Sequence, residues 1–193
     1  IHFIGEDMPF ATSISTNDLI KDNNDIMIAY KMNNSDLPLD QGYPLRIIAP
    51  GYTGSKNVKW VKSIIISDKE VESTWQTGYV YKKIPNNIKD VKDINLDEIQ
   101  KIPTVEKMPI QSFICYPENN DIIKSNKMTI KGIAYSGGGK NIKKVEILLD
   151  NKWYPATLKE GTQQKENKAW AWTFWEAEIP ILKKGSYKIT VRS

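Results

Sequence analysis

One arginine stands inside an otherwise apolar stretch, in the string GYPLRIIAPG that runs from Gly42 to Gly51. A buried guanidinium is costly unless an anion pairs with it, so Arg46 indicates an anionic partner. Two lysines, Lys56 and Lys59, follow a glycine turn at Gly54. Together with backbone N–H groups, these cations could form an anion pocket. An arginine that extends to a sheet edge would explain the same pattern without a ligand.

The sequence offers few other residues that could bind a metal or phosphate or act as a nucleophile. His2 is the only histidine and Cys115 the only cysteine, which excludes an intrachain disulfide, a Cys-based metal cluster and a zinc site built from the two. The segment Ser136–Lys140 lacks the spacing of a phosphate-binding loop and is more typical of a hairpin. We expect Cys115 to be a buried, unreactive thiol. We name no metal ligand in this chain.

The composition indicates a globular protein with a mixed charged surface. The 27 basic and 23 acidic residues give a net charge of +4 without a Lys/Arg block, which favours a solvated surface over a nucleic-acid-binding face. Because no apolar run reaches about 18 residues, we expect no membrane span. The first residues carry neither an initiator Met nor signal-peptide features, so we expect a processed or truncated product whose secretion signal could have been lost.

The elements that must position these residues differ between the two parts of the chain. The first part is irregular, with a brief helix starting near Ser15 and strands over 26–30, 45–49 and 58–66. Residues 86–107 are polar and weakly periodic, and we place a domain boundary there, between 1–105 and 106–193. The second part predicts a sandwich with strands at 111–115, 128–135, 144–149, 153–158, 169–179 and 187–191. Asp150–Asn151 is a tight hairpin turn, and Trp170, Trp172 and Phe174 should share one strand face, in the sandwich core or as a stacking platform.

The same strings carry a family resemblance. GYPLRIIAPG followed by GSKNVKW is similar to the signature of the sulfite oxidase family of molybdopterin enzymes. MPIQSFIC, MTIKGIAYSGGGKNIKKVEILLDNKWYPATL and KAWAWTFWEAEIP resemble that family's dimerisation domain. The resemblance implies an α+β, mostly β chain: the C-terminal half of a sulfite-oxidase-type molybdopterin domain, then an immunoglobulin-like β-sandwich truncated at its C-terminus.

The resemblance also implies cofactor-binding residues. Asp7, in a GxD-like stretch, would contact the pterin, and Arg46 would bind the phosphate end of the cofactor. Gln41 stands where the family often has a His, a departure that weakens one contact although the amide can still form hydrogen bonds. The three residues before the Trp of the VKW string would line the cofactor as well: Asn57, Val58 and Lys59.

A tyrosine near the molybdenum and substrate is implied by the stretch Trp75–Lys82. Tyr81 is the candidate catalytic residue, and Tyr79 is its rival because the spacing is one residue off. The family's molybdenum-ligating Cys lies in an upstream motif that is absent here, and Cys115 does not match it. A C-terminal continuation with a substrate-site Arg is also missing. We therefore expect the parent protein to be an enzyme and this chain alone to be inactive.

By this resemblance the parent protein binds molybdenum-molybdopterin and oxidises sulfite to sulfate by oxo transfer, passing electrons to a cytochrome c-type haem protein. Its expected partners are a second copy, through the sandwich domain, and a small oxyanion substrate. The periplasm is the expected compartment, with the mitochondrial intermembrane space as the alternative. Two other functions stay open: a non-catalytic β-sandwich binding or assembly module, favoured by Gln41 and the missing Cys, and a carbohydrate-binding sandwich that uses the tryptophans.

Overall fold

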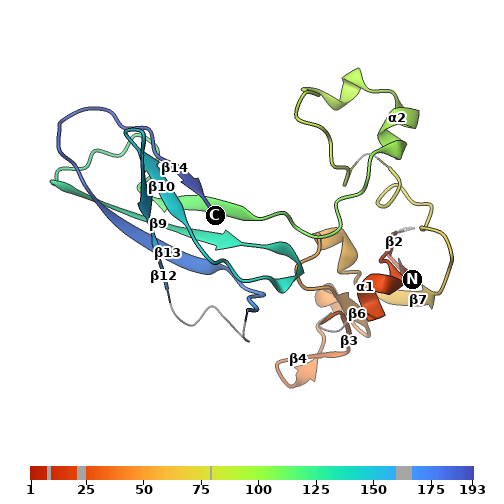
Figure 1. Ribbon diagram of the computed structural model, residues 1–193. Helices are drawn as coiled ribbons and strands as arrows, with labels where there is room; N and C mark the ends of the chain where they lie inside the picture. The colour runs from red at the N-terminus through yellow and green to blue at the C-terminus, as the bar shows by residue number, and fades with distance from the viewer. Residues whose placement is uncertain (8–9, 21–24, 79, 160–166) are drawn as a thin grey trace. The chain divides into compact units, whose positions relative to one another are not determined.

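The computed structural model describes residues 1–7, 10–20, 25–78, 80–159 and 167–193 (Figure 1). The chain divides into two compact units, Ile1–Met108 (unit 1) and Pro109–Ser193 (unit 2). Most regular structure is β, with two short α-helices in the described residues, so the predicted α+β, mostly β class is confirmed. None of these helices is long and apolar enough to cross a membrane.

Unit 1 is built from short strands. Its largest sheet is antiparallel in the order β2-β1-β7: β2 (Ala11–Ser13), β1 (His2–Gly5) and β7 (Val61–Ile65). Two strand pairs accompany it: β3 (Met27–Ala29) with β6 (Arg46–Ile48), and β4 (Lys31–Met32) with β5 (Ser35–Asp36). The helices are α1 (Thr16–Ile20) and α2 (Leu96–Lys101), with 3-10 turns η1 (Leu39–Gln41), η2 (Gly54–Lys56) and η3 (Val91–Asp93).

The core of unit 1 contains residues from two basic strings of the sequence, GYPLRIIAPG and GSKNVKW. Its buried cluster consists of Phe3, Ile14, Ile47, Ala49, Tyr52 and Val58. Ile47 and Ala49 come from the GYPLRIIAPG string and Val58 from the GSKNVKW string. The N–H of Ile47 donates to the carbonyl of Val58 over 2.7 Å. Apolar burial and this hydrogen bond therefore hold the two basic strings side by side.

Unit 1 differs in part from the elements expected from its sequence. The brief first helix is present as α1. The strand expected over 58–66 begins only at Val61, because the preceding loop ends at Trp60 with a left-handed φ of 49°. Within the polar segment 86–107 the chain forms α2, whose Asn95 side chain accepts a hydrogen bond from the N–H of Glu98 over 3.0 Å. This N-cap was the available signal for the helix.

Unit 2 is a sandwich of two antiparallel sheets. One sheet has the order β12-β13-β9-β8 and the other the order β11-β10-β14. Their bounds are β8 (Gln111–Tyr116), β9 (Lys127–Tyr135), β10 (Glu146–Leu149), β11 (Lys152–Pro155), β12 (Thr157–Leu158), β13 (Thr173–Pro180) and β14 (Thr190–Arg192), with the 3-10 turn η4 (Gly137–Gly139) before β10.

Both sheets of unit 2 contribute to one core. Burial alternates along β9 and β13, and the inward residues pack with those of β10. The largest fully buried side chain is Trp175. A Cβ added to Gly132 would lie 2.2 Å from the Trp175 ring, so only glycine leaves room for it. The predicted turn between β10 and β11 is also present, with φ of 47° at Asp150 and 60° at Asn151.

Two predictions for unit 2 were wrong. Trp170 and Trp172 precede β13, which begins at Thr173, so only Phe174 lies on the expected strand; Trp170 instead packs on Gly139, where an added Cβ would meet its ring at 2.1 Å. Cys115 is exposed rather than buried. Alternation along β8 explains this, because Ile114 packs against the sandwich core and Cys115, two residues after the exposed Phe113, lies on the opposite face.

Candidate functional site

Three side chains of unit 1 are held by three successive backbone carbonyls. The indole Nε1 of Trp60 donates to the carbonyl of Leu39 over 2.7 Å. The ammonium of Lys59 donates to the carbonyl of Asp40 over 2.7 Å, and Nη1 of Arg46 donates to the carbonyl of Gln41 over 3.0 Å. We call residues 39–42 with Arg46, Lys59 and Trp60 the turn cluster. It gathers two cations and an indole around one 3-10 turn.

Backbone geometry explains why the turn cluster forms. Gly42 ends η1 with a φ of 108°, a conformation that favours glycine. A Cβ at Gly42 would lie 2.9 Å from the Cβ of Lys59, so the turn can approach the lysine only without a side chain. Trp60 is also left-handed, which is uncommon for a bulky residue. Its bond to Leu39 and the Lys59 ammonium, 4.4 Å from the ring centroid, stabilise that conformation.

Arg46 keeps one donor unused. Its Nε is buried and has no hydrogen-bond partner among the described residues. Buried donors are usually satisfied, so an unpaired one within a basic cluster indicates room for a further acceptor. A guanidinium binds phosphate or carboxylate oxygens through two parallel N–H groups. The turn cluster therefore fits the anionic end of a ligand.

A shallow hollow adjoins the turn cluster at Trp60. It has a volume of about 360 Å³ and is lined by Glu6, Asp7, Tyr43, Pro44, Trp60, Val61 and Lys62. The N–H of Glu6 donates to the carbonyl of Trp60 over 2.8 Å, which fixes the loop that carries Asp7. Asp7 and Trp60 of the turn cluster thus line the same hollow. Gln41 belongs to η1, and its amide donates to the carboxylate of Asp40 over 3.1 Å.

Two predicted site residues use their side chains to hold the loop. The Oδ1 of Asn57 accepts from the N–H of Ala49 over 2.7 Å, and its Nδ2 donates to the carbonyl of Thr53 over 3.3 Å. Val58 is 2% exposed and packs in the core of unit 1. We therefore assign any ligand contact of these two residues to their backbone.

Lys56 does not join the anion pocket that the sequence suggested. Its side chain is fully buried, and its ammonium donates to the carbonyl of Ser13 over 2.7 Å and to Oε1 of Gln76 over 2.6 Å. The Glu106 carboxylate lies 3.7 Å away. Burial lowers the pKa of Lys56, although the charges of Glu106 and Glu70 oppose this. Lys56 anchors η2 to the interior while Lys59, three residues later, faces the turn.

Gln76 is the centre of this buried network. Its Oε1 also accepts hydrogen bonds from the hydroxyl of Thr12 over 3.0 Å and from the N–H of Ser13 over 3.2 Å. Its backbone carbonyl accepts from the hydroxyl of Thr104 over 2.8 Å. Sequence reading missed Gln76 because no local pattern marks a polar residue most of whose side-chain partners lie twenty or more positions away.

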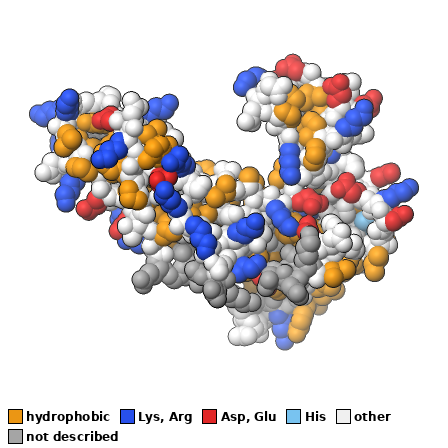
Figure 2. Space-filling model, in the orientation of Figure 1, with side chains coloured by type: hydrophobic (Ala, Val, Ile, Leu, Met, Phe, Trp, Pro, Cys, Tyr) orange, Lys and Arg blue, Asp and Glu red, His pale blue; other side chains and the backbone are white. Residues whose placement is uncertain are grey.

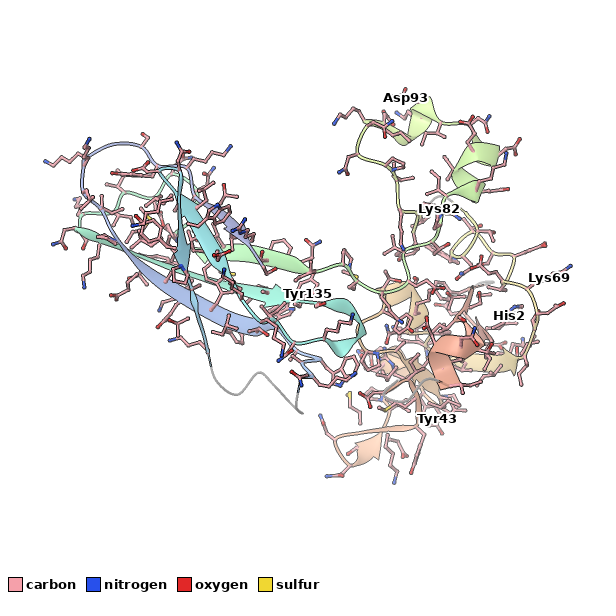
Figure 3. All side chains as sticks on the ribbon, in the orientation of Figure 1. His2, Tyr43, Lys69, Lys82, Asp93 and Tyr135 are labelled. Atoms are coloured by element: carbon pink, nitrogen blue, oxygen red, sulfur yellow. The ribbon has the colours of Figure 1, made fainter. Side chains whose placement is uncertain are left out.

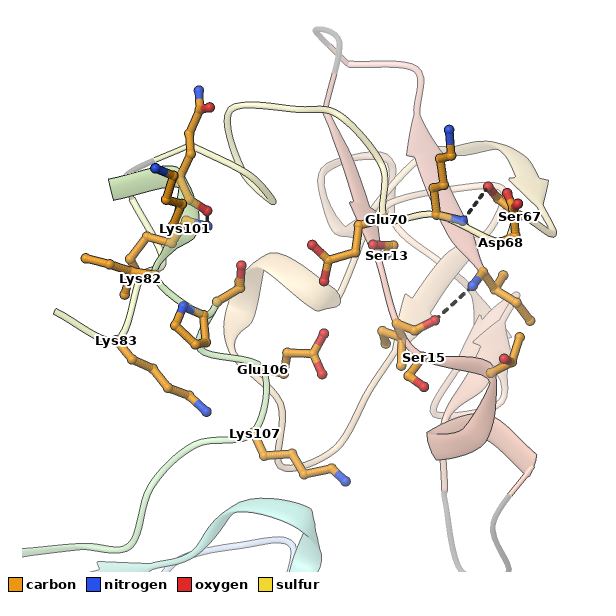
Figure 4. A pocket seen from close by; sticks show the side chains of 18 residues that line it. Ser13, Ser15, Ser67, Asp68, Glu70, Lys82, Lys83, Lys101, Glu106 and Lys107 are labelled. Carbon is orange, nitrogen blue, oxygen red and sulfur yellow. Dashed lines mark hydrogen bonds between the residues drawn. The ribbon is translucent and has the colours of Figure 1, made fainter. Parts of the chain in front are cut away.

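A larger hollow of about 690 Å³ adjoins this network, because Ser13 and Glu106 line it (Figure 4). Glu70 and Glu106 extend into it, and Lys82, Lys83 and Lys101 stand on one side of the view. His2, whose Nε2 lies 2.7 Å from the carbonyl of Lys69, bonds to the loop that forms another part of the wall (Figure 3). The lining contains both acidic and basic side chains, so the hollow has no single preference of charge.

Tyr81 contacts residues outside the turn cluster. Its ring lies 6.5 Å from that of Trp75, which in turn lies 5.3 Å from Phe10. Its carbonyl accepts from the N–H of Val105 over 2.7 Å. Within the described part of the chain, no hydrogen bond or ring contact joins Tyr81 to Arg46 or Lys59. Its rival Tyr79 lies outside the described residues.

Trp60 and Asp40 are functional candidates that sequence reading did not single out. Trp60 follows Lys59 directly, and this adjacency was the signal that could have pointed to a stacked ammonium. Asp40 contributes a backbone carbonyl, which carries no sequence signal. In the view of Figure 2 the basic side chains are scattered over the surface. The turn cluster is distinguished by its hydrogen bonds.

Two known protein families match this chain. Residues 1–75 match the profile of the oxidoreductase molybdopterin binding domain, and residues 102–193 match that of the Mo-co oxidoreductase dimerisation domain. The turn cluster lies within the first match. Tyr81 and α2 lie between the two matches.

Similar proteins agree with both profiles. Human (Homo sapiens) mitochondrial sulfite oxidase is 35% identical over 159 residues, which cover 81% of this chain and 28% of that protein. Gallus gallus sulfite oxidase is 31% identical over 175 residues, 90% of this chain and 37% of that protein. Nitrate reductase [NADH] 2 of Phaseolus vulgaris is 33% identical over 199 residues, 95% of this chain and 22% of that protein.

A solved structure shares the fold. The crystal structure of the sulfane dehydrogenase SoxCD from Paracoccus pantotrophus superposes with a TM-score of 0.68 at 24% identity, covering 94% of this chain and 42% of that one. Fold and sequence together define a molybdopterin oxidoreductase. The chain belongs to the sulfite oxidase family and spans 28% and 37% of the human and Gallus gallus relatives. The predicted family is therefore confirmed, and with it the molybdenum cofactor that the family binds.

Proposed function

We propose that this chain is part of a molybdenum-dependent oxidoreductase that oxidises sulfite to sulfate and passes electrons to a cytochrome c-type haem protein. The observation that carries the proposal is the turn cluster, in which a buried arginine donor without a partner stands beside an anchored lysine. The sulfite oxidases among the relatives support the reaction. We assign residues 1–105 to the cofactor domain and 106–193 to an immunoglobulin-like dimerisation domain, through which the protein forms a homodimer.

Arg46 and Lys59 would hold the phosphate end of molybdenum-molybdopterin by charge-assisted hydrogen bonds. Asp7 would accept hydrogen bonds from pterin N–H groups beside Trp60. The backbones of Asn57 and Val58 and the Gln41 amide would complete the binding surface. When bound, the cofactor supplies oxo transfer to the substrate and accepts two electrons.

We propose that Tyr81 orients the oxyanion substrate or assists proton movement through its hydroxyl. The one cysteine of this chain, Cys115, is exposed in unit 2 and does not belong to a molybdenum-binding motif. We therefore propose that residues 1–193 alone do not catalyse the reaction. The periplasm is the proposed compartment, and the mitochondrial intermembrane space is the alternative; the human relative is named mitochondrial.

The cofactor assignment is tested by Arg46→Gln in the complete protein, produced in a host that makes the molybdenum cofactor. Loss of the guanidinium should lower the molybdenum content per chain about tenfold or more, because a charge-assisted hydrogen bond contributes about 1.5–3 kcal/mol. Arg192→Gln, at the other arginine of the chain, is the matched control and should bind molybdenum as the wild type does. Unchanged molybdenum in Arg46→Gln would contradict the assignment.

The reaction is tested with the same preparations. Loaded wild-type protein should reduce cytochrome c when sulfite is added, and nitrate should not oxidise the reduced enzyme. A fully loaded protein that ignores sulfite would overturn the substrate but not the cofactor site. A purified wild-type protein without molybdenum would favour a non-catalytic module.

A further inference from the structure

Gln76 is a buried amide side chain that the proposed cofactor site does not use. It is 1% exposed. Its Oε1 accepts three hydrogen bonds, from the ammonium of Lys56 over 2.6 Å, the hydroxyl of Thr12 over 3.0 Å and the N–H of Ser13 over 3.2 Å. Its Nε2 donates to Oε1 of Glu70 over 3.4 Å. A buried amide with this many partners is held in one orientation.

The main chain around Gln76 is linked to Tyr81. The carbonyl of Gln76 accepts a hydrogen bond from the hydroxyl of Thr104 over 2.8 Å. The residue after Thr104 is Val105, whose N–H donates to the carbonyl of Tyr81 over 2.7 Å. The residue before Gln76 is Trp75, whose ring centroid lies 6.5 Å from that of Tyr81. Both the main chain and the ring of Tyr81 therefore contact segments that Gln76 helps to hold.

Lys56 connects the side chain of Gln76 to the loop of the proposed cofactor site. Lys56 is the last residue of η2 and directly precedes residues 57–59, which we assign to that site. The segment that contacts Tyr81 reaches η2 as well. The N–H of Thr53 donates to the carbonyl of Glu106 over 2.8 Å, and the Glu106 carboxylate lies 3.7 Å from the Lys56 ammonium. The cofactor loop and the Tyr81 segment are thus joined around one buried amide.

Tyr81 depends on such a connection. Within the described part of the chain, no hydrogen bond or ring contact joins it directly to Arg46 or Lys59. The turn cluster is held by the carbonyls of residues 39–41, and none of those bonds involves Gln76. A shift of about 1 Å in a catalytic group can lower a reaction rate about a hundredfold. Loss of Gln76 should therefore impair the reaction and leave cofactor binding largely intact.

We infer that Gln76 is a positioning residue, which sets the place of Tyr81 relative to the cofactor loop. The inference rests on the proposed roles of Tyr81 and of residues 57–59, and Gln76 acts through them without touching the substrate. An amide suits this position because its oxygen faces the ammonium of Lys56 while its nitrogen faces the carboxylate of Glu70. An apolar side chain loses both bonds, whereas a glutamate keeps the accepting oxygen.

The first measurement is sulfite oxidation by the complete, molybdenum-loaded protein. Gln76→Leu should lower kcat/KM per bound molybdenum about tenfold or more and keep the molybdenum content within about twofold of the wild type. Gln76→Glu should recover most of this loss. Gln100→Leu, at an exposed glutamine of α2, is the matched control and should behave as the wild type does. If leucine prevents folding, Gln76→Asn, which keeps the amide on a shorter side chain, should show the same loss in smaller measure.

A double-mutant cycle tests whether Gln76 acts through Tyr81. In the Tyr81→Phe background the group to be positioned is gone, so Gln76→Leu should then cost less than about twofold in kcat/KM. A residue that only stabilises the fold would cost the same in both backgrounds.

Hydrogen–deuterium exchange supplies a measurement that does not depend on activity. In the chain of residues 1–193, Gln76→Leu should speed exchange of the Val105 amide, which is bonded to Tyr81, about tenfold. The amide of Ile47, bonded to Val58 in the core of unit 1, should exchange as in the wild type. A general loss of stability would instead speed both amides alike.

These outcomes separate the inference from the proposed function. Wild-type kcat/KM in loaded Gln76→Leu, an equal loss in both backgrounds, or equal acceleration of the two amides would overturn the positioning role while the sulfite reaction stands. Tyr81→Phe as active as the wild type would overturn the proposed role of Tyr81 and the inference with it. A loaded wild type that ignores sulfite would overturn the proposed substrate, and the exchange of the Val105 amide would still decide for or against Gln76.

Discussion

Lys56 and Lys59 lie in one short loop, but one lysine is buried and the other lies at the surface. The side chain of Lys56 is fully buried, and its ammonium donates to the carbonyl of Ser13 and to Oε1 of Gln76. The ammonium of Lys59 donates to the carbonyl of Asp40 at the surface. A buried ammonium is tolerated because three oxygen-bearing groups surround it. The surface lysine keeps its charge available to a ligand. Only the second belongs to the proposed cofactor site.

Replacing Lys56 with Met should destabilise the chain by about 1–3 kcal/mol, because buried oxygens lose their donor. The pKa of Lys56 is lowered in the fold, so the unfolded chain binds more protons in the pH range below the ordinary value of 10.5. Stability therefore rises with pH in that range. Urea unfolding at neutral and alkaline pH should show the advantage of the wild type over Lys56→Met growing as pH rises. Lys62→Met, at an exposed lysine, is the control, and an advantage that shrinks would contradict this sign.

Gly42→Ala should damage the turn cluster. The added Cβ would lie 2.9 Å from the Cβ of Lys59, and the φ of 108° disfavours any other residue. We expect a loss of roughly 1 kcal/mol or more in stability and less molybdenum in the complete protein. Gly54→Ala is the matched control, because no atom lies within 4 Å of its added Cβ. Equal behaviour of the two variants in denaturant midpoint and molybdenum content would refute the proposed role of Gly42.

At the scale of elements, the sequence predicts hairpins and strands with alternating buried and exposed residues. It does not predict the irregular loops. Burial alternates along β9 and β13 with the period of a strand, and turn residues mark where β10 ends. The strand expected from Val58 starts late, because residues 54–60 form a loop held by Asn57. The helix α2 lies in a segment too polar for apolar periodicity to reveal it.

The hairpin between β10 and β11 offers a test at this scale. Asn151 has a φ of 60°, which asparagine tolerates and a β-branched residue does not. Asn151→Val should cost about 1–2 kcal/mol, whereas Asn151→Gly should leave the stability within about 1 kcal/mol of the wild type. Thermal unfolding measures both. Equal melting temperatures for the valine and glycine variants would mean that the turn does not constrain this backbone.

At the scale of the whole molecule, each unit has a core of its own. Unit 1 packs around Ile47 and Val58, and unit 2 around Trp175 and the inward residues of β9, β10 and β13. Trp175→Ala should cost about 3–5 kcal/mol in unit 2, where the ring fills the space over Gly132. Hydrogen–deuterium exchange should then lose protection in residues 109–193.

The matched variant for unit 1 is Val58→Ala, which removes a buried side chain from the other core. It should lower the protection of residues 1–108 and leave the sandwich unchanged. If either variant lowered protection equally throughout the chain, the two units would unfold as one. That result would contradict two separately stabilised domains.

The sequence by itself determined the family, the mostly β class and the hairpin at Asp150–Asn151, because ordered strings, alternation and turn residues are local properties. It also pointed to Arg46 as a cation that needs an anion. Only the tertiary structure decided which basic residues share a surface, and how Leu39, Asp40 and Gln41 present carbonyls to Trp60, Lys59 and Arg46. In an irregular loop no fixed period assigns side chains to faces, so contacts between residues far apart in the chain make that choice.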